Sequence, residues 1–383
     1  MNGTAVRAVL IALVLGCMLV TCTAGGGLYL WARQEGLNPV KAIQLRLSLA
    51  RSDEALNTPA GSDPTTRRFT VNSGDSASTI AANLLADGLI SDSGLFVDYV
   101  VYHRLDDELE AGTFFLQQTQ TIPQIARALT DAASATIPFR TLEGWRLEEI
   151  AQVIDSNPLL DFSGADFLAV VGPGGTIPAD FKARVGIPDT LSNGRSPSLE
   201  GFLYPGTYQL KPGITPEELR DEMLAEFDAH VTSEFYDDAA EGLTMYQVVT
   251  LASIVQKEAV DLDEAPVIAS VYLNRFRLPM RLDADPTVQY ALGNTRDAST
   301  WWPSITQADY YGLDGLPNQS YSTYLNEDLP PGPIAAPGLP AIRAVVQPAE
   351  TQYYYFRRGC EDDNRHVFFT LDQQADHANF TCD

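Results

Sequence analysis

The most constraining feature of the sequence is an apolar run without a charged residue, from Ala8 to Trp31. A helix over this run would be about 36 Å long at about 1.5 Å per residue, enough to cross the ~30 Å hydrocarbon core of a bilayer. Tyr29 and Trp31 lie where interfacial aromatic residues are usually found. We therefore expect a transmembrane helix over residues 8–31, with residues 1–7 cytoplasmic, and a single-pass cell-membrane protein with an extracytoplasmic bulk.

Two other interpretations of this run remain open. Arg7 and a shorter apolar core ending near Ala24 fit a cleaved signal peptide, and Cys17 or Cys22 could carry a lipid. The glycines at 25–27 form a poor helix. All three interpretations place most of the chain outside the cytoplasm, and we favour the retained span.

Length and charge restrict the remaining possibilities. The 383 residues predict two folded units with connectors, and 45% hydrophobic residues are enough to form cores. There are 25 Lys and Arg residues against 50 Asp and Glu residues, a formal net charge of −25. We expect no nucleic-acid partner, because such a chain has few cations with which to release counterions from phosphates.

The positions of the cysteines and histidines bear on the cellular compartment of the protein and on whether it binds a metal. Cys360 and Cys382 could pair in an oxidising compartment, although the sequence does not fix their geometry. The four histidines show no metal-ligand spacing, and neither HExxH nor CxxC occurs. We expect neither a metal nor a cofactor.

The segment after the apolar run predicts connectors and then a small unit. We assign residues 32–67 to a juxtamembrane helix (Pro39–Leu56) and a linker rich in Pro, Ser and Thr, and residues 68–135 to the small unit. Its first strand, turn and helix predict an inward face of Ile80, Leu84 and Leu85. This V-x-x-G-D-S pattern resembles a LysM-type module, a fold that binds N-acetylglucosamine-containing glycans; a plain turn and helix N-cap explain it equally well.

Residues 136–383 form the second predicted unit, a mixed α+β domain, so the expected fold class of the chain is α+β. Within it, Leu243–Val260 is the most informative helix, because Thr244 and Gln247 make a capping box. At 100° per residue, Glu258 falls on the same stripe as Leu251 and Val255, whereas Val249 and Gln256 point the opposite way.

A carboxyl group on such an inward stripe loses hydration, so its pKa should rise. A carboxylic acid that keeps its proton near neutral pH can protonate the leaving oxygen of a glycosidic bond. Two alternatives remain: Glu258 pairs with a cation such as Arg275, or the helix end opens to solvent.

Five motifs in this order carry a family resemblance: LEGFLYPGTY from Leu199, LASIVQKEA from Leu251, YLNRFRLPMRLDADPTVQYALG from Tyr272, YSTYLNEDLPPGPIAAPGLPAIRAVVQPA from Tyr321 and YYYFRRGCEDDNRHVFFT from Tyr353. Together they resemble the endolytic murein transglycosylases, the MltG (YceG-like) family, from roughly Thr136 onward. A single N-terminal span and a LysM-like unit also match that architecture.

The resemblance implies a catalytic residue and an activity. The family's catalytic Glu falls on Glu258, whereas the first acid of its EKE-type motif is Gln256 here and the Asn of its YNTY motif is Ser322. The implied enzyme is a lyase that cleaves the β-1,4 bond between N-acetylmuramic acid and N-acetylglucosamine in peptidoglycan strands. Glu258 would act first as general acid and then as base, leaving a 1,6-anhydro-muramyl end.

The resemblance also implies substrate contacts and partners. Peptidoglycan synthases are implied as partners near the nascent strands. The Asp285-Pro286-Thr287 segment is equally well explained as a turn that starts a helix. The candidates for substrate binding, which include Asp285 and Thr287, are Glu200, Asn274, Arg275, Asp285, Thr287, Gln289, Tyr324 and His366.

Two rival functions remain at this point. A hydrolase with two carboxylates would use Asp283 or Asp285 as its second group and would add water to the product. A scaffold that binds glycan without cleaving it would be indifferent to Glu258→Gln.

Overall fold

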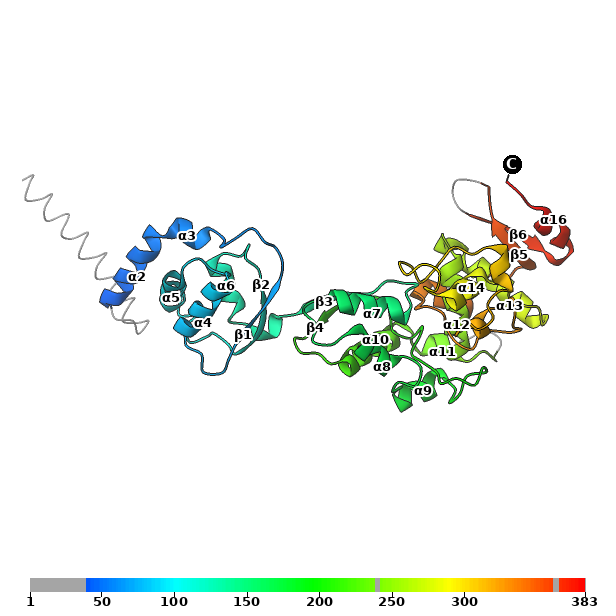
Figure 1. Cartoon of the computed structure of the whole chain (residues 1–383), viewed down its shortest axis with the longest axis horizontal. Helices are drawn as coiled ribbons and strands as arrows, with labels where there is room; N and C mark the ends of the chain where they lie inside the picture. Colours follow the sequence, from blue (N-terminus) through cyan, green and yellow to red (C-terminus); the bar gives the residue numbers. More distant parts are fainter. Residues whose placement is uncertain (1–38, 238–241, 361–364, 383) are drawn as a thin grey trace, which may run out of the picture. The chain divides into compact units, whose positions relative to one another are not determined.

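The computed structural model describes residues 39–237, 242–360 and 365–382 (Figure 1). The apolar run at 8–31, with its predicted span, lies outside these residues. Among the described helices, none combines the length and apolarity needed for a membrane crossing. The chain divides into two units, Met1–Thr136 and Ile137–Asp383.

The first unit is built on a two-stranded antiparallel sheet in which Phe69 lies opposite Phe114. Two helices connect the strands, and further helices precede and follow the pair (Figure 1). The elements are α2 (Pro39–Arg51), α3 (Asp53–Asn57), β1 (Arg67–Val71), α4 (Ala77–Ala86), α5 (Ser93–His103), β2 (Gly112–Leu116) and α6 (Ile122–Ala128).

Local sequence explains where α4 begins and which face it buries. The Ser76 side chain accepts a 3.2 Å hydrogen bond from the backbone N–H of Thr79, which caps the helix. Ile80 and Leu84 are buried as predicted, but Leu85 is 42% exposed, so its predicted inward position is wrong. Leu85 follows Leu84 by 100° around the helix, which turns it off the buried face.

Helices α2 and α3 belong to the same core. Leu49 of α2 and Leu56 of α3 are buried in it, and the Ser48 hydroxyl donates a 2.8 Å hydrogen bond to Asp98 of α5. The helical part of the segment predicted to be juxtamembrane therefore packs onto the first unit.

The second unit holds two more antiparallel pairs, β3–β4 and β5–β6, and most of the helices. Within the described residues the sheets have two strands each, which confirms a mixed α+β fold. The longer elements are β3 (Ile137–Arg140), α7 (Leu147–Ser156), α8 (Gly164–Val171), α9 (Ala179–Val185), β4 (Thr207–Leu210), α10 (Pro216–His230), α11 (Ser233–Asp237), α12 (Met245–Glu258), α13 (Ala265–Arg277), α14 (Asp285–Leu292), α15 (Leu339–Val346), β5 (Tyr353–Arg358), β6 (His366–Thr370) and α16 (Gln374–Asn379).

Helix α12 lies at the centre of this unit and packs against α13, α14 and α15. We expected one buried stripe, yet Val249 and Ile254, on opposite sides, are both fully buried. The loop at Gly201 covers the Val249 side. Gly201 has φ +85°, and a Cβ there would lie 2.4 Å from Cβ of Pro333 and 3.1 Å from Val249, so only glycine allows this close approach.

A disulfide joins Cys360, after β5, to Cys382, after α16, a pairing that the sequence allowed but left open. Between the two cysteines the chain forms β6 and then turns back, so that α16 packs against β5 and β6 (Figure 1). The bond therefore fixes the segment carrying α16 to the β5–β6 hairpin.

Candidate active site

Glu258 is the last residue of α12, and the start of that helix is fixed as predicted. Thr244 and Gln247 form a reciprocal capping box, with bonds of 2.9 and 3.3 Å between each side chain and the other's backbone N–H. The carboxyl-terminal end of a helix carries partial negative charge, which disfavours a carboxylate there. The sequence thus places this acid where its charged form is costly.

The half-buried Glu258 side chain opens into a cavity of about 570 Å³ in the second unit. Helices α12, α13, α14 and α16 and the β5–β6 hairpin all contribute to its wall. The lining residues are Glu258, Tyr272, Arg275, Leu282, Asp283, Asp285, Tyr310, Tyr324, Tyr355, Phe356, Arg357, Arg358, His366, Gln374, His377 and Ala378.

Tyr272 of α13 is the direct partner of the acid, because its hydroxyl donates a 2.8 Å hydrogen bond to Oε1 of Glu258. Burial raises the pKa of Glu258 to about 7, and the negative charge of Asp285 adds to the rise. The Tyr272 bond and the positive charge of Arg275 oppose it. Burial wins, so the carboxyl group can hold or release a proton near neutral pH, as acid–base chemistry requires.

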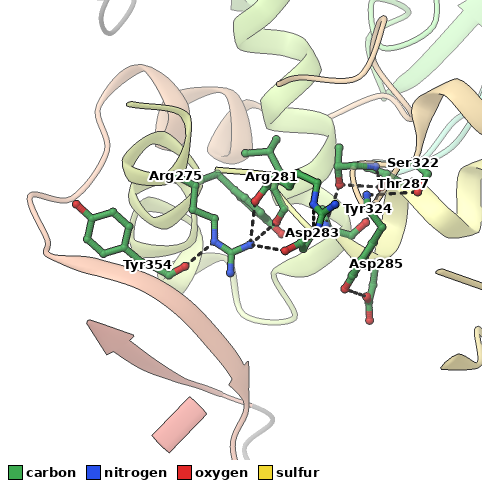
Figure 2. Close-up of polar contacts among 12 residues, drawn as sticks. Arg275, Arg281, Asp283, Asp285, Thr287, Ser322, Tyr324 and Tyr354 are labelled. Carbon is green, nitrogen blue, oxygen red and sulfur yellow. Dashed lines mark hydrogen bonds and ion pairs between the residues drawn. The ribbon is translucent and has the colours of Figure 1, made fainter. Parts of the chain in front are cut away.

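Arg275 does not form the ion pair with Glu258 that we considered as an alternative; it organises the cavity wall. Its Nε donates to the carbonyl of Tyr354 at 2.5 Å and its Nη1 to that of Leu282 at 2.6 Å, and Asp283 lies 3.8 Å away (Figure 2). The guanidinium thereby ties strand β5 to the loop that precedes α14.

Asp283 is held in an unusual conformation in that loop. Its φ is +46°, a left-handed value that is costly for a residue other than glycine. Oδ1 of Asp283 is buried without a hydrogen bond, and burial raises the pKa of this carboxyl above its usual range. Asp283 also forms ion pairs with Arg275 and Arg281, at 3.8 and 3.6 Å, and it shares the cavity with Glu258 as a second candidate for contact with substrate.

Asp285 and Tyr324 meet at the first turn of α14. The Tyr324 hydroxyl donates a 2.8 Å hydrogen bond to Oδ1 of Asp285 (Figure 2). Thr287, one of the predicted binding residues, is fully buried, and its hydroxyl donates 2.6 Å to the carbonyl of Ala284. Thr323 accepts the N–H of Ala284 at 2.9 Å, so the two predicted motifs are hydrogen-bonded to each other.

His366 begins strand β6 and faces the same cavity. Its backbone N–H donates to Glu264 at 3.0 Å, and its Nδ1 lies 3.1 Å from the same carboxylate. Glu264 is buried at the start of α13. This pairing sets the orientation of the imidazole against the cavity.

The remaining predicted residues lie elsewhere or bind the protein itself. The Asn274 amide donates to the carbonyls of Thr351 and Tyr353, at 3.0 and 2.9 Å, and that of Gln289 donates 3.0 Å to Pro303. Glu200 lines a different cavity of the second unit. The structure thus brings together Glu258, Arg275, Asp285, Tyr324 and His366.

Sequence reasoning missed several residues of the cavity. Tyr272 lies one helix after Glu258, and the sequence carries no local signal for their hydrogen bond. Arg357 comes from β5, and Gln374 and His377 come from α16, which reach the cavity only through the fold of the β5–β6 hairpin. The possible pairing of Cys360 with Cys382 is the sequence signal that could have pointed to α16.

The two departures from the family motifs, Gln256 and Ser322, do not line the Glu258 cavity. The Gln256 side chain accepts a 2.9 Å hydrogen bond from the backbone N–H of Gly338, a residue next to α15. Ser322 is fully buried.

In the described part of the chain, no three His, Cys, Asp or Glu side chains are grouped so as to hold a metal ion.

Comparison with known proteins gives the family of the chain. A sequence model of the YceG-like family matches residues 69–379, and the chain belongs to that family. The match begins within β1; we expected the motifs from roughly Thr136 onward, with the upstream unit also matching the family's architecture. The matched region therefore includes residues 69–136 of the first unit as well as most of the second unit.

Two relatives show how far the likeness extends. The endolytic murein transglycosylase of Streptococcus pneumoniae (strain D39) is 28% identical over 320 residues, 79% of this chain and 56% of that protein. The endolytic murein transglycosylase of Bacillus subtilis (strain 168) is 29% identical over 314 residues, 80% of this chain and 81% of that protein. The chain thus spans little more than half the length of the pneumococcal relative.

A solved structure gives the same family. The crystal structure of a YceG-like protein from Listeria monocytogenes aligns with a TM-score of 0.52 and 28% identity, covering 81% of this chain and 98% of that one.

Proposed function

We propose that this protein is an endolytic lytic transglycosylase that cleaves peptidoglycan glycan strands. The observation that carries the proposal is Glu258, an acid with a pKa of about 7 in a cavity large enough for sugar rings. The names of the relatives from S. pneumoniae and B. subtilis support the same activity.

In the proposed reaction, one carboxyl group serves two steps in succession. Protonated Glu258 gives its proton to the oxygen of the β-1,4 bond between N-acetylmuramic acid and N-acetylglucosamine, and that bond breaks. The resulting carboxylate takes the proton of the muramyl C6 hydroxyl, whose oxygen closes onto C1. The product has a 1,6-anhydro end, and no water is consumed.

Tyr272 supports both steps through its hydrogen bond to the Glu258 carboxyl group. Its hydroxyl stabilises the carboxylate that forms after the first transfer and limits the rise of the Glu258 pKa. Asp285 opposes that carboxylate and favours the protonated starting form. The two neighbours keep the acid able to give a proton and to take one back.

The decisive experiment is digestion of purified glycan strands, followed by mass analysis of the ends. We expect anhydro ends from the wild type, none from Glu258→Gln, and wild-type products from Glu217→Gln, an exposed control on α10. The Glu258→Gln protein should still bind glycan. Equal cleavage by Glu258→Gln would refute the proposed mechanism.

A hydrolase with two carboxylates is the second candidate, because Asp283 and Asp285 share the cavity with Glu258. It predicts reducing ends heavier by one water than the lytic products. The same mass analysis therefore separates the two reactions.

Three further parts of the proposal concern location and partners. We propose that residues 8–31 anchor the chain in the membrane, that the first unit binds glycan as LysM-type modules do, and that peptidoglycan synthases are partners. The disulfide between Cys360 and Cys382 supports an extracytoplasmic location, since such bonds persist in oxidising compartments. Membrane fractionation of the full chain, compared with a chain lacking residues 1–31, tests the anchor.

A further inference from the structure

The second unit contains another cavity, of about 380 Å³, which shares no lining residue with the Glu258 cavity. Its walls come from the start of α7, the loop at Glu200, the end of α14 and the segment around Tyr321. We call it the Glu200 cavity; its principal lining residues are Arg146, Glu200, Tyr290, Trp301, Asn318 and Tyr321.

Two chain segments run from one cavity to the other. Helix α14 has Asp285 in the Glu258 cavity and Tyr290 in the Glu200 cavity, and it is about 12 Å long at about 1.5 Å per residue. The following segment repeats this arrangement, with Tyr324 in the first cavity and Tyr321 in the second. The two cavities are therefore neighbours within the second unit.

The buried cation of this cavity already has its partners. The Arg146 side chain is about 1% exposed, and it donates to both oxygens of Glu148 at 3.1 Å. Its guanidinium lies 4.0 Å above the Tyr290 ring and 5.0 Å from that of Trp301. Because Glu148 matches its charge, Arg146 holds the aromatic wall in place and offers little to an anionic ligand.

Glu200 supplies the buried polar group of the cavity. The residue is 4% exposed, and its Oε2 accepts a long 3.3 Å hydrogen bond from the N–H of Leu147. Burial raises the pKa of Glu200 to about 8, and the charge of Glu148 adds to the rise. The carboxyl group therefore keeps its proton at neutral pH and offers one donor and one acceptor to an uncharged ligand.

We propose that the Glu200 cavity binds an N-acetylhexosamine ring of the same glycan strand, a few units from the bond placed at Glu258. The inference rests on the proposed function. Aromatic walls with a few convergent polar groups, here a neutral acid and the Asn318 amide, suit an uncharged sugar ring.

The proposal predicts that affinity depends on strand length. A short oligosaccharide fills only the Glu258 cavity, whereas a longer one reaches both cavities and gains contacts at Glu200. Replacement of Glu200 removes that gain, because the ligand then faces an apolar wall.

The test uses full-length protein carrying Glu258→Gln and calorimetry with β-1,4-linked N-acetylglucosamine di-, tetra- and hexasaccharides. We expect Glu200→Leu to remove about a tenfold gain in affinity between the shortest and the longest ligand, the effect of about one lost hydrogen bond. Asn318→Ala, a milder change nearer the rim, should reduce the same gain without affecting the buried acid. The control Glu217→Gln should retain it.

Thermal melting of each variant verifies that it is folded. An unchanged length dependence in both folded variants overturns the inference, as does an equal loss for all three ligands. Failure of the proposed function would appear differently, as wild-type protein that does not cleave glycan strands.

Discussion

The hydroxyl of Tyr272 on α13 donates a 2.8 Å hydrogen bond to the carboxyl group of Glu258 at the end of α12. The two residues lie at the meeting point of two packed helices, and burial affects both. It raises the pKa of Glu258 to about 7 and lifts the pKa of Tyr272 well above its ordinary value. Tyr272 therefore stays a hydrogen-bond donor through the whole pH range in which Glu258 titrates.

The first prediction concerns Tyr272→Phe, which removes this bond but keeps the ring that packs against Phe356. The bond stabilises the carboxylate, so its loss should raise the pKa of Glu258 above about 7. The alkaline limb of kcat/KM should then move up by about one pH unit. A limb that stays in place or moves to lower pH would contradict the role given to Tyr272.

The second prediction concerns Asp285→Asn, which should lower the pKa of Glu258 where Tyr272→Phe raises it. Asp285→Asn removes a negative charge that raises the pKa of Glu258, so the alkaline limb should move to lower pH. Asparagine keeps an acceptor for the Tyr324 hydroxyl, which preserves the local hydrogen bond. Near-complete loss of activity at every pH would instead favour Asp285 as the second carboxylate of a hydrolase.

Features that depend on neighbouring residues could be predicted from the sequence. The capping box at Thr244 and Gln247 and the cap at Ser76 follow from side chains that bind backbone groups three residues away. The positions of Cys360 and Cys382 outside the apolar run allowed them to pair, and the structure joins them. For the same reason, the start of α12 was predicted to within a residue or two.

Features that depend on distant segments could not be predicted. Strand β3 pairs with β4 although Ile137 and its partner Leu210 are far apart in sequence. Residue spacing on one helix could not reveal that Val249 is buried by the Gly201 loop, nor that Tyr272 reaches Glu258. The helical-wheel argument correctly placed Glu258 against other elements, but it wrongly left the Val249 face open.

The third prediction concerns the disulfide and α16. Gln374 and His377 of α16 line the Glu258 cavity, and the bond between Cys360 and Cys382 fixes this helix to the hairpin. Reduction, or the double change to serine, should loosen this wall and raise KM severalfold with a smaller effect on kcat. The serine variant should not respond to reducing agent, which separates this effect from others of the reagent.

The same bond should also contribute to stability. It closes a loop with a sequence separation of 22 residues, so its removal should lower the free energy of unfolding by about 3 kcal/mol. Urea unfolding of the oxidised protein and the serine variant measures the difference. Unchanged KM together with unchanged stability would mean that the packing of α16 alone holds this wall.

The last prediction concerns the pH dependence of stability through Glu200. Its pKa is about 8 in the folded protein against an ordinary value of 4.5, so between these values the folded state holds more protons than the unfolded state. The free energy of unfolding should therefore fall as pH rises across this window, by up to about 1.4 kcal/mol per pH unit.

Glu200→Gln should remove this dependence, because the amide does not titrate and its oxygen can still accept the N–H of Leu147. The variant should therefore gain stability relative to the wild type as pH rises from about 5 to about 8, measured by urea unfolding at a series of pH values. Glu217→Gln, at an exposed position, serves as the control and should give a curve parallel to the wild type. Parallel curves for Glu200→Gln as well would show that Glu200 is charged in the folded protein, and the neutral donor assigned to its cavity would be lost.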